Sequence, residues 1–202
     1  MAMNNYLSII TLNVNGLNTP IKTHRRAEWI RKHDPHICCL KDTHLRTKDL
    51  HRLKVKGWKQ IFQANAQEKK SRVAMHVPDN VDFKKRAIKR DPEGHFIILE
   101  GRIHQEDINI GNIYASNIGA PKYIKKILED FKKDMDSNTI IVGDFNTPLS
   151  KMDRSSKQNN KEDIVSLNNT LEEMDLTDIY RAFHPKEANT HSFQMHMEHF
   201  QR

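Results

Sequence analysis

Cysteine is nearly absent from this chain of 202 residues: there are two, and they are neighbours, Cys38 and Cys39. Adjacent cysteines rarely bridge each other, and no third one is present to complete another disulfide or a zinc site. Long apolar runs are also absent, as is a basic and apolar leader at residues 1–6. We therefore expect a protein of a reducing compartment, in the nucleus or the cytoplasm, that is not secreted and does not enter a membrane.

Charged residues are plentiful, with the basic ones in excess. The 33 Lys and Arg residues against 26 Asp and Glu residues give a net charge of +7. This excess favours a polyanionic partner such as nucleic acid, although many ordinary soluble proteins share it. Hydrophobic residues make up 37% of the chain, which is enough for a folded domain. The length and the lack of repeats predict one α/β domain, which we expect to be a monomer.

The first part of the chain has the pattern of a strand, a helix and a second strand. Residues 7–14 are rich in β-branched side chains and end at an Asn-Gly turn, residues 23–32 place apolar side chains on one helical face, and residues 37–40 are apolar. Asn13 and Asp42 therefore fall where predicted strands end.

The middle of the chain predicts a sheet followed by a helix. Short apolar or alternating segments separated by turn residues suggest an antiparallel meander, and they are residues 58–63, 73–77, 95–102 and 107–114. An amphipathic helix from Pro121, a buried strand at 139–142, a helix at 164–174 and a packed segment at 176–180 are expected to follow.

The segment after residue 189 has neither strand alternation nor a clear helical face, so no regular element is expected there. His191, His196 and His199 could be considered as a metal cluster. A one-sided His-rich tail rarely supplies a closed site, so the interpretation as an ordinary polar tail is favoured.

Polar residues recur where apolar strands end. Asn13, Asp42, Asp144 and Asn146 all occupy such positions, and strand ends that meet at one sheet edge are common ligand sites. Their oxygens suit Mg²⁺. Asp144 and Asn146, two apart on a segment expected to be extended, should point the same way. The alternative, that each Asn or Asp simply caps a turn, stays open.

Four motifs at these positions resemble those of the exonuclease-III-like endonuclease/exonuclease/phosphatase superfamily. They are Thr11-Leu-Asn-Val-Asn-Gly16, Asp42-Thr-His-Leu45, Asn112-Ile-Tyr-Ala115 and Gly143-Asp-Phe-Asn146. Residues 9–186 are more similar still to the endonuclease domain of mammalian LINE retrotransposons, including the segments 52–58, 147–150 and 179–181.

The resemblance implies a fold and an activity. The fold would be a four-layer α/β sandwich, and the activity Mg²⁺-dependent cleavage of a DNA phosphodiester, with Mn²⁺ as a substitute metal. The nick would leave a 3′ hydroxyl that primes reverse transcription. Asn13 and Asp42 match metal positions, Tyr114 matches a residue that contacts the reacting phosphate, and Asp144 with Asn146 matches the pair that activates water and stabilises the transition state.

The resemblance also implies partners. DNA would be held mainly through its backbone, and a reverse transcriptase domain of the same polyprotein would be an ancestral partner. Asn117 and Arg154 match positions near the DNA backbone. A turn Asn and a solvated Arg are the equally weighted alternatives for these two residues.

Three substitutions depart from the family pattern. Asp42 stands where the family has Glu, and Lys41 where it has an uncharged Gln. The shorter carboxylate and the nearby ammonium group should both lower metal affinity. Ser116 replaces a Pro and should loosen the loop that carries Tyr114.

The end of the chain departs further. After residues 184–186 the family continues into a DNA-reading hairpin and an Asp-His pair that acts in proton transfer, and this sequence continues differently. Loss of such a pair removes a factor of ~10²–10⁴. We therefore expect a domain at 7–186 that lacks its last strands, a frameshifted non-family tail at 187–202, and little or no activity.

Three other interpretations stay open. The chain could be a repair endonuclease for apurinic or apyrimidinic sites from the same superfamily, although the retroelement segments argue against it. It could be a basic remnant that holds DNA without cutting it. It could also be an unstable fragment, because missing strands would leave an open apolar sheet edge.

Overall fold

The computed structural model describes residues 7–64, 71–147, 161–183 and 193–196. The strands are β1 (Ile9–Asn13), β2 (Ile37–Leu45), β3 (Gln60–Gln63), β4 (Ser71–Val77), β5 (Phe83–Arg90), β6 (Phe96–Ile103), β7 (Glu106–Tyr114), β8 (Thr139–Asp144), β9 (Thr177–Asp178) and β10 (Phe193–His196). The helices are α1 (Pro20–His33), η1 (Thr47–Leu53), α2 (Ala120–Phe131), η2 (Lys132–Asp134), α3 (Lys161–Glu173) and α4 (Ile179–Phe183), of which η1 and η2 are 3₁₀ helices.

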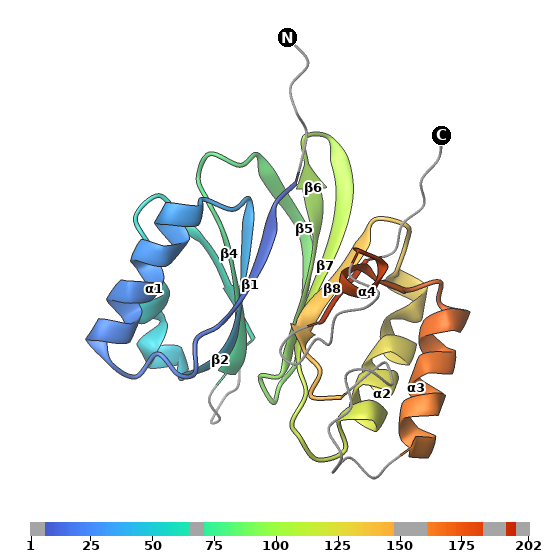
Figure 1. The fold of residues 1–202 in the computed structure, drawn as a ribbon. Coiled ribbons are helices and arrows are strands. Elements are labelled where there is room, and N and C mark those ends of the chain that lie inside the picture. Colours follow the sequence, from blue (N-terminus) through green and yellow to red (C-terminus); the bar gives the residue numbers. More distant parts are fainter. Residues whose placement is uncertain (1–6, 65–70, 148–160, 184–192, 197–202) are drawn as a thin grey trace.

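The strands form two sheets that face each other. The smaller sheet has the order β1-β2-β4-β3, and the larger has the order β5-β6-β7-β8-β10-β9. Within them, β1 runs parallel to β2 and β7 runs parallel to β8. Figure 1 shows α1 on the outer side of the smaller sheet and α2 with α3 on the outer side of the larger one. The four-layer α/β sandwich predicted from the sequence is thus confirmed.

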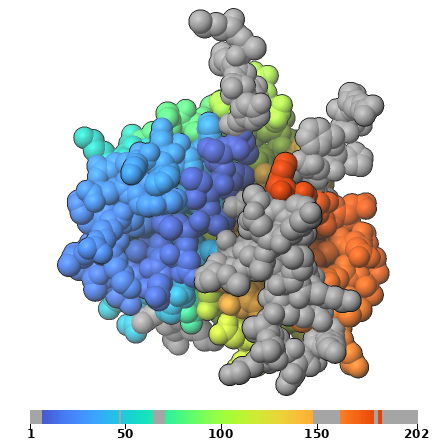
Figure 2. Space-filling model, viewed as in Figure 1, coloured from blue at the N-terminus to red at the C-terminus, as the bar shows by residue number. Residues whose placement is uncertain are grey.

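Buried side chains fill the three spaces between the four layers. The core between the sheets contains Met75, Leu99 and Ile110. A second core lies under α1, around Ile30 and Leu40. The third, under α2 and α3, is built around many apolar side chains, among them Ile113, Ile124, Ile127, Leu128, Phe145, Leu167 and Leu171. In the space-filling view, α1 and β1 form one side of the visible face and α3 the other (Figure 2).

Local sequence explains the two helices that cover the sheets. The hydroxyl of Thr19 accepts a hydrogen bond from the Lys22 backbone at 3.4 Å and caps α1, which has Pro20 in its first turn. Asp34 ends α1 in a left-handed conformation. The buried apolar residues of α2 recur every three or four positions and belong to the core that the helix shares with α3 and the larger sheet.

The predicted antiparallel meander does not form one continuous sheet. Its first two segments became β3 and β4 of the smaller sheet, whereas the last two became β6 and β7 of the larger sheet. Strand β5 was not predicted, because Phe83–Arg90 is dominated by Lys and Arg. This strand lies at the edge of its sheet, where charged side chains protect unpaired backbone from other chains.

The expected lack of a strand after residue 189 is also wrong. Strand β10 pairs with β8 in antiparallel register, from Phe193 opposite Gly143 to His196 opposite Ile140. Such pairing is made by backbone groups, so it does not require a recognisable side-chain pattern. The domain boundary at residue 186 and the frameshift stay predictions, while His191 and His199 lie outside the described residues.

None of the helices in the described ranges combines the length and the apolar character that crossing a membrane would require.

Candidate active site at the strand ends

Two pairs of parallel strands bring the predicted site residues to one place. Asn13 ends β1 and lies opposite Lys41 of β2, and Tyr114 ends β7 opposite Asp144, the last residue of β8. The two pairs belong to different sheets, and the Lys41 ammonium group links them by donating to the Gly143 carbonyl at 3.2 Å. The predicted convergence of these strand ends is therefore present.

Strand β2 is irregular where it carries Asp42. Its pairing with β4 shifts register between Lys41 and Leu45, and both Asp42 and His44 have positive φ angles, of 55° and 53°. Residues other than glycine rarely adopt this conformation, which is often found at functional sites. Between them, the buried Thr43 hydroxyl donates to the Ser71 carbonyl at 2.8 Å and holds the bulge in place.

The bulge places Asp42 among nitrogen atoms. Its Oδ1 lies 2.9 Å from Arg72 Nη1 and 2.5 Å from His44 Nε2. These two nitrogens are themselves 2.8 Å apart. Nε2 cannot both donate to Asp42 and accept from Arg72, and the shorter contact favours the tautomer in which Nε2 donates to the carboxylate.

Arg72 is anchored from two further sides. Its backbone N–H donates to the Gly94 carbonyl at 2.8 Å. Its guanidinium carbon lies 5.1 Å from the centre of the Tyr114 ring, within the range of a cation–π contact. This arginine from β4 therefore connects the Asp42 bulge to the end of β7.

Tyr114 is a half-buried member of the site. Burial raises the pKa of its phenol, Asp42 and Asp144 raise it further, and the Arg72 guanidinium opposes them. The phenol therefore stays protonated and able to donate a hydrogen bond at neutral pH.

Lys41 is the buried cation of the site. Its side chain is 1% exposed. Burial lowers the pKa of Lys41, an effect opposed first by the nearby carboxylate of Asp144 and then by Cys39. The uncharged residue that the resemblance implies at this position is thus replaced by an ammonium group that faces both Gly143 and Asp144.

The segment after β8 differs from the extended form expected for it. Asp144 ends the strand, and Asn146 has a left-handed φ of 46°. Alternation along a strand therefore does not set the direction of the Asn146 side chain. Its amide instead donates to the Ala115 carbonyl at 2.7 Å and ties the ends of β7 and β8 together.

The remaining predicted residues contribute less to the cluster. The exposed Asn13 accepts a hydrogen bond from the Asn15 backbone at 3.0 Å, which is the turn-capping role given as the alternative. Asn117 is exposed in the loop after β7, beside Ser116, whose hydroxyl donates to the Ile118 carbonyl at 3.3 Å. Arg154 lies outside the described residues.

Sequence reasoning missed Arg72 and His44. His44 was seen only as part of a motif, and Arg72 was not considered. The available signal was a lone arginine beside the run Val73–Val77, with Asp42 and His44 both at the end of the strand before it.

The donors of this site do not fit a divalent cation as they are arranged. Asp42 is already engaged by Arg72, Lys41 faces Asp144, and Asn13 caps a turn. Within the described part of the chain, no group of three His, Cys, Asp or Glu side chains is placed to hold a metal ion. Mg²⁺ would need several free oxygen ligands, mainly carboxylates.

A protein-family model matches most of this chain. The model of the endonuclease/exonuclease/phosphatase family matches residues 10–193. The chain belongs to this family.

Solved structures with the family fold are similar over nearly the whole chain. The endonuclease domain of TRAS1, a telomere-specific non-LTR retrotransposon, is 15% identical with a TM-score of 0.67, and the match covers 94% of this chain and 84% of that one. An AP endonuclease from Archaeoglobus fulgidus is 21% identical (TM-score 0.66; 94% and 86% covered). The 3′ phosphatase NExo from Neisseria, bound to a product DNA hairpin, is 18% identical (TM-score 0.67; 95% and 87% covered). These likenesses confirm the fold.

Proposed function

We propose that the chain descends from the DNA endonuclease of a mammalian LINE retrotransposon and that this copy is inactive or severely impaired. The ancestral enzyme would use Mg²⁺, or Mn²⁺ in its place, to nick target DNA and so prime reverse transcription. The observation that carries the proposal is the meeting of Asp42, Tyr114 and Asp144 at one edge of the two sheets. The family match and the retroelement motifs support it.

The proposal gives the residues of β7 and β8 the chemical roles. The protonated Tyr114 phenol would donate a hydrogen bond to the reacting phosphate. Asp144 would accept a proton from the attacking water, and Asn146 would orient that water and donate to the charge that develops on the phosphate. Asn146 is fixed by its bond to Ala115, which restricts its amide to one orientation.

Impairment follows from the residues of β2 and β4. Asn13 and Asp42 match the metal positions, but Asp42 is paired with Arg72. Lys41 places a further positive charge beside Asp144. A metal ion would have to bind close to these two cations, so affinity for Mg²⁺ is expected to be low.

The proposed descent from a DNA endonuclease also implies that the partner of the chain is DNA. The backbone of a strand would pass the exposed loop that carries Asn117, Arg154 would be a further contact with it, and the net charge of +7 would favour binding. Because DNA is the substrate, the ancestral protein would have to reach the nucleus.

Nicking of supercoiled plasmid in the presence of Mg²⁺ tests the proposal. The wild-type chain is expected to nick no faster than the D144A variant, which removes the carboxylate at the end of β8. Nicking far above that of D144A would show that the impairment is wrong.

The repair-enzyme alternative needs its own substrate. A duplex with a single abasic site should be cut no faster than the same duplex without it. Selective cutting at the abasic site, lost in D144A, would favour an AP endonuclease over the retroelement enzyme.

A further inference from the structure

The contacts of Arg72 offer a role for the site that differs from metal-dependent cleavage. This side chain brings a permanent positive charge to the carboxylate of Asp42 and to the ring of Tyr114. Arg72 and His44 both contact Oδ1 of Asp42, so a divalent cation bound to this carboxylate would lie close to the guanidinium and would be repelled by it.

We propose that the Arg72 guanidinium takes the place of the divalent cation, so that the site binds a phosphate group of a DNA strand without metal. This inference rests on the proposed function, because DNA is the ligand.

The geometry leaves Arg72 able to take a second anion. A guanidinium has five N–H donors in a planar fork, and the recorded contacts of the Arg72 side chain with Asp42 and His44 both use Nη1. With described residues, Nε and Nη2 form no recorded hydrogen bond. The side chain is 32% exposed, so part of it is accessible to an anion from solvent.

Phosphate is the anion that this arrangement fits. Arginine binds phosphate through two parallel N–H donors, and partial burial strengthens such bonds. Asp42 and the Tyr114 ring hold the guanidinium in one orientation. The phenol of Tyr114 is a further donor for a phosphate oxygen. A strand that approaches the ends of β7 and β8 would present its phosphates to these groups.

The site would therefore be a DNA-holding site that works in the absence of divalent ions. The Asp42 carboxylate orients the arginine in this role instead of holding a metal. Removing the charge at position 72 should then have two opposite effects: weaker binding of DNA and stronger binding of metal.

Two matched variants of the full chain test this inference. R72Q keeps a polar side chain that can still donate to Asp42 but removes the charge. R102Q makes the same change at Arg102, whose Nε is paired with Asp107 at 3.0 Å at the opposite end of β7. Thermal unfolding of both variants checks that they fold like the wild type.

Two binding measurements are made on each protein. Anisotropy of a fluorescein-labelled DNA duplex is titrated in EDTA at fixed salt, and Mn²⁺ binding is followed by electron paramagnetic resonance without DNA. Wild type and R102Q should bind DNA equally in EDTA and show no saturable Mn²⁺ site. R72Q should bind DNA about tenfold more weakly, since it loses hydrogen bonds from a charged donor, and should bind Mn²⁺ more strongly than the wild type does.

The outcomes separate this inference from the proposed function. A saturable Mn²⁺ site in the wild type, or DNA binding by R72Q equal to that of R102Q, would overturn the inference alone. Absence of DNA binding by all three proteins would overturn the DNA partner that the proposed function assigns to the chain, and this inference with it.

Inorganic phosphate distinguishes a strand from a free ion. Added at constant ionic strength against a chloride control, phosphate should displace DNA from the wild type and have less effect on R72Q. Phosphate binding at Arg72 that leaves DNA retention unchanged would overturn the strand as the ligand.

Discussion

The two halves of the site are built in different ways. At the ends of β7 and β8, backbone positions dominate: Gly143 lies against Ile113 so closely that no side chain fits, and Asn146 binds the Ala115 carbonyl. At the ends of β2 and β4, charged side chains dominate, since Asp42 is held by Arg72 and Lys41 is buried. The packed backbone at Gly143 leaves no room for a larger residue. The bulge at Asp42 is lined by side chains, so a substitution there can place an arginine where a metal ion would bind.

The two outer cores, one under α1 and one under α2 and α3, also differ in the polar side chains that they bury. Under α1, Arg26 and His76 are buried, and the ring nitrogens of His76 have no hydrogen-bond partner among the described residues. Under α2 and α3, the apolar cluster is accompanied by uncharged polar groups, the buried Thr170 and the Tyr123 hydroxyl, which has no hydrogen-bond partner among the described residues. The smaller sheet therefore contains the groups whose burial is most costly, and we expect it to be the less stable half.

The largest expected effect comes from filling the space at Gly143. A Cβ atom there would lie 1.9 Å from the Ile113 carbonyl oxygen, so β7 and β8 would have to separate. G143A should destabilise the protein by about 4 kcal/mol, in the range that marks severe steric conflict. Denaturant unfolding measures the change.

A matched substitution at a second glycine distinguishes the effect of this steric clash from the effect of backbone strain. Gly57 also has a positive φ, of 85°, but a Cβ there would meet nothing within 4 Å. G57A should therefore lose only about 1 kcal/mol. Equal losses in the two variants would show that close packing at Gly143 is not the reason for its glycine.

The next effect is a dependence of stability on pH that arises from His76. Burial and then the nearby Arg26 lower the pKa of His76 from 6.5 to about 3. Because the folded pKa lies below the unfolded one, the unfolded state binds more protons than the folded state between these two pKa values, so stability is highest above pH 6.5 and falls as the pH drops toward 3. Between pH 7 and pH 4 the loss should be about 3 kcal/mol.

H76L tests this effect by removing the titrating group. The variant should be more stable than the wild type at pH 7 by about 1–2 kcal/mol, because two buried polar atoms without partners are gone. It should also lose less stability on acidification. H24L on the exposed side of α1 is the control and should keep the wild-type pH dependence. A pH dependence that is the same in H76L and the wild type would contradict the assignment to His76.

The sequence was informative where local pattern determines structure. The three-to-four-residue spacing in α2 and the apolar runs of β1, β2 and β8 predicted these elements. The strand ends predicted that Asn13, Asp42, Asp144 and Asn146 would converge, whereas Tyr114, which lies opposite Asp144, was assigned through the family resemblance. Strand β5 was missed because an edge position tolerates a Lys- and Arg-rich sequence. Strand β10 was missed because backbone pairing with β8 defines it.

The decisive contact of the site could not be predicted, because it depends on register. Asp42 and Arg72 are far apart in the chain, and they meet only because the β2–β4 pairing shifts between Lys41 and Leu45. A one-residue change in register would send a side chain to the other face of the sheet. Composition and spacing carry no signal for such a bulge, so the substitutions at positions 41 and 42 were noticed, but the pairing of Asp42 with Arg72 was not.

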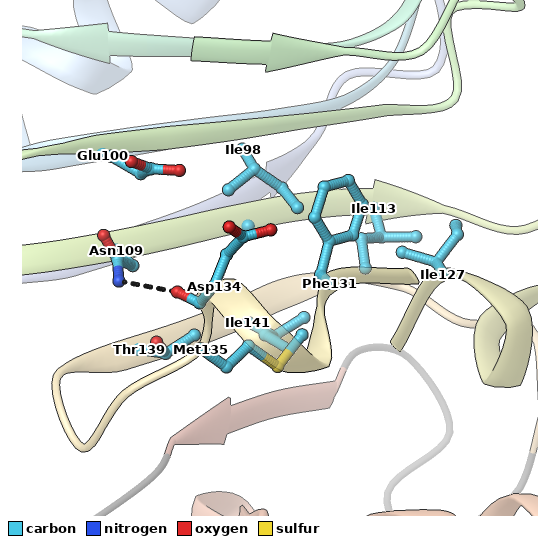
Figure 3. A pocket seen from close by; sticks show the side chains of 11 residues that line it. Ile98, Glu100, Asn109, Ile113, Ile127, Phe131, Asp134, Met135, Thr139 and Ile141 are labelled. Atoms are coloured by element: carbon cyan, nitrogen blue, oxygen red, sulfur yellow. Dashed lines mark hydrogen bonds between the residues drawn. The ribbon is translucent and has the colours of Figure 1, made fainter. Parts of the chain in front are cut away.

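The smallest expected effect tests the quality of packing in the larger sheet. A small apolar pocket lies between the end of α2, η2 and the strands β6, β7 and β8 (Figure 3), and Gly111 is one of its lining residues. A Cβ on Gly111 would lie 3.7 Å from side-chain atoms of Ile98 and Ile141, an ordinary contact distance. G111A should raise stability by about 0.5–1 kcal/mol, because alanine loses less entropy than glycine in a strand and its methyl group adds contacts.

The matched variant is G101A in the neighbouring strand, where a Cβ would lie 2.4 Å from the Phe83 ring and stability should fall instead. If G111A is destabilising like G101A, the pocket does not have room for a methyl group, and the larger sheet is packed as tightly beside α2 as it is at Gly143.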